Sequence, residues 1–76
     1  MNKLRRKQLD EVIAKIEEAK ELLETLQEEE EEYRDNMPEN LQGSEKYEMA
    51  DEAVDNMSSA VDALDEAVSY IESAQE

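Results

Sequence analysis

Apolar residues recur at intervals of three and four along most of the chain, which is the spacing of one face of an α-helix. Across residues 3–34 this stripe consists of Leu4, Leu9, Val12, Ile13, Ile16, Ala19, Leu22, Leu23 and Leu26. Across residues 45–74 two sets repeat every seven residues, namely Tyr47, Val54, Val61 and Val68, and Ala50, Met57, Leu64 and Ile71. A β-strand would need a period of two, which neither segment has. The pattern therefore predicts two long amphipathic helices.

The segment between the predicted helices, residues 35–44, contains the only proline and the only glycine of the chain. Two long helices joined by a short connection form an antiparallel hairpin. In this connection Pro38 suits the first position of a one-turn helix, and Gly43 suits a left-handed helix stop. Ser44 suits the N-cap of the second helix, and Leu41 is expected to fold back onto the end of the helix pair. We predict a structured corner at residues 35–44.

A chain of 76 residues is near the lower limit for a self-sufficient apolar core, and it has no cysteine for a disulfide. Two helices alone would also leave part of each apolar stripe in water. A second hairpin would cover the remainder and complete a four-helix bundle. A ridge of small residues that would allow close approach consists of Ala53, Ala60, Ala67 and Ala74. We predict an all-α protein, an antiparallel helical hairpin that assembles into a four-helix bundle or a larger homo-oligomer.

The 23 acidic residues outweigh the eight basic residues and give a formal net charge of -15. Such a field repels nucleic acids and anionic membranes and attracts basic protein surfaces, so we predict neither nucleic-acid nor membrane binding. The chain has no histidine, no cysteine and no glycine-rich phosphate loop, and a helical rod offers no enclosed pocket. We therefore predict no catalysis, no metal site and no cofactor. The basic start is followed by mixed residues, so we expect no signal peptide and a cytoplasmic location.

Half of the positive charge lies in a basic cluster, Lys3, Arg5, Arg6 and Lys7, at the start of the first predicted helix. One interpretation is simple pairing one helical turn away, Arg6 with Asp10 and Lys7 with Glu11. The other is an anion pocket in which Arg5, Arg6 and Lys7 reach the polar corner of an antiparallel neighbouring copy. The polar residues that could recognise a base or a ribose there are Asn36, Asn40, Gln42, Ser44 and Tyr47.

Two groups of carboxylates are also candidates for binding. Residues 28–32 form an acidic run of five glutamates, which is either a solvated helix extension or a docking surface for a basic groove. The outer face of the second predicted helix carries Glu48, Asp51, Glu52, Asp55, Asp62, Asp65 and Glu66. Carboxylates repeated along a rigid rod can imitate a phosphate backbone, although any soluble amphipathic helix has a charged outer face.

The segment EEEEEYRDNMPENLQGSEKYE at residues 28–48, with the Ala- and Asp-rich residues that follow, resembles small acidic hairpin proteins of phages, prophages and mobile elements of Gram-positive bacteria. The resemblance implies action in the cytoplasm of a bacterial host, and it supplies no catalytic residues. By analogy with small phage proteins, it also suggests a role against host defence.

Three functions remain open. The first is an oligomeric sponge that sequesters a nucleotide-type immune signal at pockets between subunits. The second is an acidic mimic of DNA that inhibits a host nuclease, as an anti-CRISPR or anti-restriction protein would, with a basic host protein as its partner. The third is a structural or assembly protein of the coiled-coil type.

Overall fold

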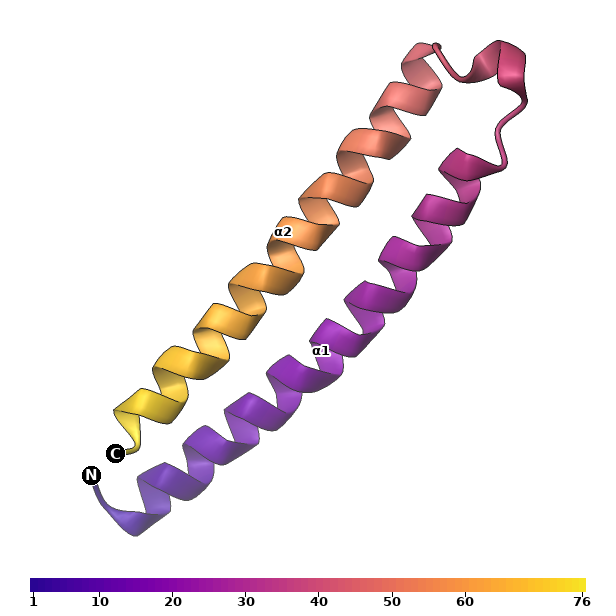
Figure 1. The fold of residues 1–76 in the computed structure, drawn as a ribbon. Helices are drawn as coiled ribbons and strands as arrows, with labels where there is room; N and C mark the ends of the chain where they lie inside the picture. The colour runs from indigo at the N-terminus through magenta and orange to yellow at the C-terminus, as the bar shows by residue number, and fades with distance from the viewer.

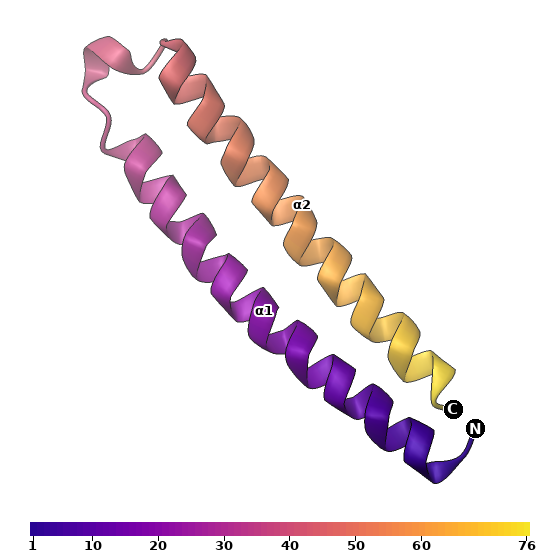
Figure 2. The same cartoon turned by 180° about the vertical axis from the view of Figure 1, so that it is seen from behind.

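The computed structural model describes residues 1–76 and consists of two long helices joined by a short corner (Figure 1). Helix α1 spans Lys3–Asp35, a 3₁₀ turn η1 spans Glu39–Leu41, and α2 spans Glu45–Ala74. The helices run antiparallel as a rod with extents of 60 × 15 × 12 Å. Both termini lie at one end of the rod and the corner lies at the other, as the views from the two sides show (Figures 1 and 2). The predicted all-α helical hairpin is confirmed, and α1 ends one residue later than predicted.

Side-chain caps begin both helices. The Oδ1 atom of Asn2 accepts a hydrogen bond from the backbone N–H of Arg5 at 2.7 Å. Ser44 does the same for α2, because its hydroxyl oxygen accepts from the backbone N–H of Tyr47 at 3.3 Å. The Ser44 hydroxyl also donates to the carbonyl oxygen of Leu41, which ties the corner to the start of α2. The N-cap predicted at Ser44 is therefore confirmed.

The two helices meet along a core seam whose members are buried or half-buried. From α1 and the corner it contains Leu9, Ile13, Ile16, Lys20, Leu23, Gln27, Glu30, Arg34 and Met37. From α2 it contains Tyr47, Ala50, Val54, Met57, Val61, Leu64, Val68, Ile71 and Gln75. Both sets repeat at alternating intervals of three and four residues, as in antiparallel coiled-coil packing. The α2 half of the seam contains every residue of the two predicted seven-residue repeats.

The α1 half of the seam differs from the prediction. The expected single stripe divides in two, because Val12, Ala19 and Leu26 are exposed on a neighbouring side of the helix. In place of a continuous apolar row, the seam of α1 takes up four long polar side chains, Lys20, Gln27, Glu30 and Arg34. Such side chains lay their aliphatic stems along apolar surface and keep their polar ends near water.

Two of these polar residues link the helices through ion pairs. The Nζ atom of Lys20 lies 2.6 Å from Oδ1 of Asp65, and a guanidinium nitrogen of Arg34 lies 2.8 Å from Oδ1 of Asp51. The hydrogen bond to Asp65 raises the pKa of Lys20, against a smaller lowering by desolvation. Hydrogen bonds to Asp35 and then Asp51 raise the pKa of Arg34. Both cations are therefore held in their charged forms by partners in the hairpin.

The corner is structured, but not by the residues predicted to close it. Met37 is only 8% exposed and covers the end of the helix pair, whereas Leu41 is 41% exposed, so the prediction for Leu41 is wrong. The one-turn helix begins at Glu39, after Pro38 in an extended conformation, rather than at Pro38 itself. Gly43 has no positive φ, so the predicted left-handed stop is also wrong.

Candidate functional site

The two sides that flank the core seam carry different kinds of exposed side chain. In an antiparallel helix pair, residues that immediately precede seam positions lie on one side, and residues that immediately follow them lie on the other. The preceding positions carry an apolar face, which we define as Val12, Ala19, Leu22, Leu26 and Tyr33 of α1 with Met49, Ala53, Ala60, Ala63, Ala67, Tyr70 and Ala74 of α2. Its large members are widely exposed: Leu22 at 62%, Met49 at 64% and Tyr70 at 76%.

Charge is distributed very unevenly between the two sides. Of the 23 acidic residues in the chain, only Glu29 occupies a position that precedes the seam. The basic residues at these positions are Lys15 and Lys46. The positions that follow the seam form an acidic side, which we define as Asp10, Glu17, Glu21, Glu24, Glu28, Glu31, Asp35, Glu48, Asp51, Asp55, Asp62, Asp65 and Glu72. The hairpin is therefore apolar on one side and strongly negative on the other.

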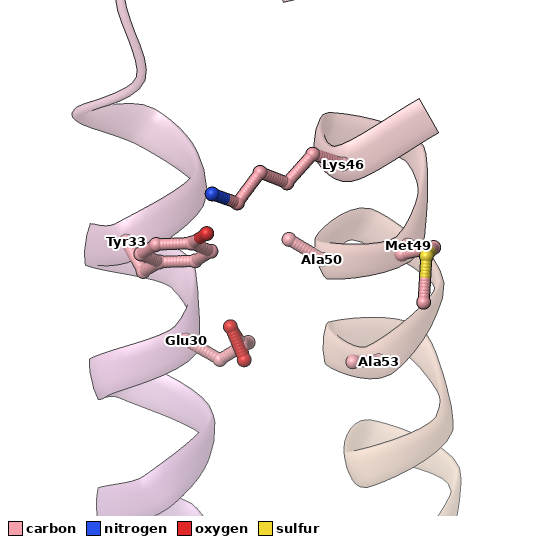
Figure 3. A pocket seen from close by; sticks show the side chains of 6 residues that line it. All are labelled: Glu30, Tyr33, Lys46, Met49, Ala50 and Ala53. Carbon is pink, nitrogen blue, oxygen red and sulfur yellow. The ribbon is translucent and has the colours of Figure 1, made fainter. Parts of the chain in front are cut away.

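A shallow groove of about 310 Å³ opens on the apolar face near the corner (Figure 3). Glu30 and Tyr33 of α1 project toward α2, with the ring of Tyr33 between the ends of Glu30 and Lys46. Met49, Ala50 and Ala53 form the opposite wall. Alanines at this wall leave the space open, because no longer side chain of α2 fills it. Glu30 thus lines the groove, whereas the sequence suggested that the run of glutamates around it is either a solvated helix extension or a docking surface for a basic groove.

A second groove adjoins the first at the corner and is lined by Tyr33, Asn36, Met37, Pro38, Leu41 and Lys46. It contains one residue of the predicted pocket, Asn36, beside two residues that sequence reasoning did not assign, Tyr33 and Lys46. A signal for both was present in the sequence. Tyr33 continues the seven-residue repeat of Val12, Ala19 and Leu26, and Lys46 precedes the alanine ridge at the same interval.

One chain does not bring the two halves of the predicted anion pocket together. Arg5, Arg6 and Lys7 lie in the first turns of α1, at the end of the rod where the termini meet. The predicted polar partners, Asn36, Asn40, Gln42, Ser44 and Tyr47, lie at the corner, at the other end of a rod 60 Å long. The Ser44 hydroxyl is occupied as a helix cap, and Tyr47 is half-buried in the core seam. Of the predicted polar partners, Asn36, Asn40 and Gln42 are therefore the exposed ones, and the acidic corner residues Asp35 and Glu39 are exposed beside them.

The basic cluster has no ion-pair partner within the hairpin. The four salt bridges of the structure involve only Lys20 and Arg34 as cations. The interpretation that Arg6 pairs with Asp10 and Lys7 with Glu11 is therefore wrong. Asp10 is occupied from the other helix, because the side-chain amide of Gln75 donates to its Oδ1 atom at 2.9 Å. Lys3, Arg5, Arg6 and Lys7 remain exposed.

The residues of the predicted acidic docking face do not all lie together. Glu48, Asp55 and Asp62 are exposed on the acidic side, while Glu52 and Glu66 lie on the outer back of α2. Asp51 and Asp65 are on the acidic side but are engaged by Arg34 and Lys20. No three acidic side chains converge in a geometry that would hold a metal ion. The arrangement offers an acidic surface, an apolar surface and shallow grooves, all of which are suited to binding.

Comparisons with protein-family models, with curated proteins and with solved structures give no match. The resemblance to phage hairpin proteins therefore stays a prediction. Neither helix combines the length and the apolar character needed to cross a bilayer.

Proposed function

We propose that this protein is a non-enzymatic binding protein that sequesters an anionic, nucleotide-type signal in pockets between copies of the hairpin, as a phage protein would to counter host defence. The observation that carries this proposal is the unpaired basic cluster in a chain with a net charge of -15. Four cations stay together without a carboxylate partner although the chain is rich in carboxylates. They are available to an anion from outside the chain.

The basic cluster lies at the start of α1, where unpaired cations are unfavourable. Cations in the first turn of a helix oppose the helix dipole, and each costs about 0.3–1 kcal/mol where nothing compensates. The first turn of α1 contains no acidic residue that would compensate locally. A phosphate group would relieve this repulsion, because Arg5 and Arg6 offer planar forks that match phosphate oxygens. Exposed amides at Asn36, Asn40 and Gln42 would supply donors and acceptors for a base or a ribose.

A thermal-shift screen against cyclic dinucleotides and ADP-ribose derivatives tests this proposal directly. A ligand at one hundred times its dissociation constant should stabilise the protein by roughly 2.7 kcal/mol. The double variant Arg5→Ala/Arg6→Ala should lose the shift. A matched control, Ser58→Asp/Ser59→Asp, lowers the net charge by the same two units in the middle of α2 and should keep it. The absence of a shift with every nucleotide tested would contradict the proposal.

The acidic side favours a second candidate, a mimic of nucleic acid that occupies the binding groove of a basic host nuclease. Its carboxylates lie along a rigid rod 60 Å long, and most of them have no cation partner. Such a complex should form at low salt and weaken as salt rises, since exposed charge contacts are screened. Replacing Asp55 and Asp62 by asparagine should weaken it further. Co-elution with a host nuclease that survives this double substitution and high salt would exclude the mimic.

The apolar face favours a third candidate, a structural or assembly protein whose hairpins pack on each other or on a larger component. This function needs the packing surface and neither the basic cluster nor the acidic side. A protein that assembles but shows no thermal shift with nucleotides and no salt-dependent complex with a nuclease would fit it.

A further inference from the structure

The apolar face is the largest feature of the hairpin that no contact within the chain explains. Val12, Leu22, Leu26 and Tyr33 of α1, with Met49 and Tyr70 of α2, are all exposed there. Only Met37, Ala50, Val54 and Val68 are buried in the whole chain. Soluble monomers rarely leave a continuous apolar surface of this length uncovered.

We propose that a second copy of this chain covers the apolar face in an antiparallel arrangement, with the two corners at opposite ends and the two-fold axis passing beside Leu22 and Ala63. This inference deepens the proposed function, because the pocket described there requires a second copy. It specifies which face pairs, in which direction and in which register.

The distribution of charge identifies a second copy as the occupant. Two chains with a net charge of -15 each repel one another unless their acidic residues are kept out of the contact. The apolar face largely meets this condition, because it carries two acidic residues: Glu29, the only one among the positions that precede the seam, and Glu30, which lines the groove beside Lys46. A basic partner would instead be attracted to the acidic side.

The size of the face is also sufficient for a stable dimer. The rod is 60 Å long and 15 Å wide, so one side of it presents on the order of 900 Å² per copy. A standard protein interface buries roughly 800 Å² per partner. The small residues of the α2 ridge would let the two copies of that helix approach closely.

Contacts within the hairpin show which residues of α1 and α2 lie at the same height. Lys20 pairs with Asp65 and Arg34 pairs with Asp51, which places Leu22 and Ala63 at nearly the same height along the rod. A two-fold axis at this height, perpendicular to the rod, sets each of these two residues opposite its own copy. The other pairs across the dimer are then Val12 with Tyr33, Ala19 with Leu26, Lys15 with Glu29, Ala53 with Ala74, and Ala60 with Ala67.

The pair of Lys15 and Glu29 distinguishes this arrangement from its main alternative. In the antiparallel register, the only acidic residue at the positions preceding the seam lies opposite a lysine of the other copy. If both corners lay at the same end, α1 would pack on the partner's α2 instead. Lys15 would then lie near the partner's Tyr70, and Glu29 near the partner's Asn56. The acidic runs of both copies, residues 28–32, would also lie together at one end.

The same register brings the two halves of the proposed pocket into contact. The helical pairing ends at Asp35, where α1 ends, so Arg5 lies at the height of the partner subunit's corner, which carries the amide of Asn40 and the carboxylate of Glu39. Each dimer would have two such places, one at each end. The basic cluster, which has no partner in its own hairpin, would there meet the exposed amides of the partner's corner.

Single cysteines test the inference cleanly, because the chain has none of its own. Leu22→Cys and Ala63→Cys should each give covalent dimers rapidly under mild oxidation or with a short bismaleimide. The control Glu24→Cys places a thiol on the acidic side near the same height, and it should cross-link at least tenfold more slowly. Cross-linking of Leu22→Cys no faster than that of the control would overturn the inference. Faster formation of a mixed Leu22→Cys/Ala63→Cys dimer than of either symmetric dimer would show corners at the same end and overturn it too.

A charge exchange provides a second measurement that does not depend on thiols. Lys15→Glu and Glu29→Lys should each raise the dimer dissociation constant by about tenfold, since each sets like charges opposite one another. The double variant Lys15→Glu/Glu29→Lys should restore the wild-type constant, whereas an additive loss would contradict the register. Successful cross-linking without any nucleotide-induced thermal shift would refute the proposed function and leave this inference intact. A nucleotide-induced thermal shift in a protein whose Leu22→Cys variant does not cross-link faster than the control would refute this inference and leave the proposed function intact.

Discussion

Replacing Leu22 by alanine tests whether the apolar face is covered in solution, and the adjacent Leu23 provides an internal standard. The two residues share the same helix, the same chemistry and nearly the same height along the rod. Leu23 lies half-buried in the core seam, whereas Leu22 is 62% exposed in the single hairpin. The same substitution at both positions therefore separates packing within a chain from packing between chains.

The expected magnitudes follow from these exposures. Leu23→Ala removes a half-buried side chain and should lower the free energy of unfolding by about 2 kcal/mol, the lower end of the range for leucine to alanine in cores. In an isolated hairpin, Leu22→Ala should cost at most about 0.5 kcal/mol, because little area is buried and alanine is the better helix former. If a second copy covers the face, Leu22 sits at the two-fold axis and its removal should cost about 2 kcal/mol per chain.

Urea unfolding followed by far-UV circular dichroism measures this difference. For an obligate dimer the midpoint should also rise with protein concentration, because association favours the folded state. If a second copy covers the apolar face, Leu22→Ala and Leu23→Ala should lower the free energy of unfolding by nearly equal amounts, and the wild-type midpoint should depend on concentration. A Leu22→Ala variant within about 0.5 kcal/mol of the wild type at all concentrations, beside a clear loss for Leu23→Ala, would show that no second copy covers the apolar face.

The corner and the seam provide three further predictions. Gly43→Ala should stabilise the protein by about 0.4–1 kcal/mol, since Gly43 has no positive φ and a Cβ there meets no atom within 4 Å; a lower melting temperature would contradict this. Met37→Ala should cost about 2 kcal/mol in urea unfolding, whereas Leu41→Ala should cost less than about 0.5 kcal/mol, because Met37 and not Leu41 is buried; the opposite order would restore the role first expected of Leu41. The pKa of Lys20 is higher in the folded protein than in the unfolded chain, where it is about 10.4. The bond of Lys20 to Asp65 therefore stabilises the protein fully at a pH below about 10.4, and this stabilisation is lost as the pH rises through the folded pKa. Thermal melts between pH 9 and pH 12 should therefore fall more steeply for the wild type than for Lys20→Gln, and equal slopes would contradict the ion pair.

The core of α2 could be predicted from the sequence because every seam position of that helix before Gln75 is apolar and repeats without interruption. In α1 the apolar residues spread over more than one stripe, and the true seam includes polar residues such as Gln27 and Arg34. No periodicity argument selects a polar residue for a seam. Its place there depends on α2, which supplies apolar surface for the aliphatic stem and, for Arg34, the carboxylate of Asp51.

At the corner, features that depend on neighbouring residues could be predicted, and features that depend on distant residues could not. Ser44 was predictable because an N-cap depends only on the helix that it begins. The burial of Met37 in preference to Leu41 depends on how the chain turns over the ends of both helices, and no local pattern encodes that. At the candidate site, the expected partner of Arg6 is taken up by Gln75, a residue 65 positions away from Asp10. Spacing along one helix gives no information about such a contact.

The mass of the wild-type protein in solution shows whether a second copy covers the apolar face. Size-exclusion chromatography with light scattering at micromolar concentration should give a dimer, twice the chain mass of 8.8 kDa, or a multiple of that dimer. A well-folded helical species with the mass of a single chain would show that the apolar face needs no second copy and that the hairpin is stable alone.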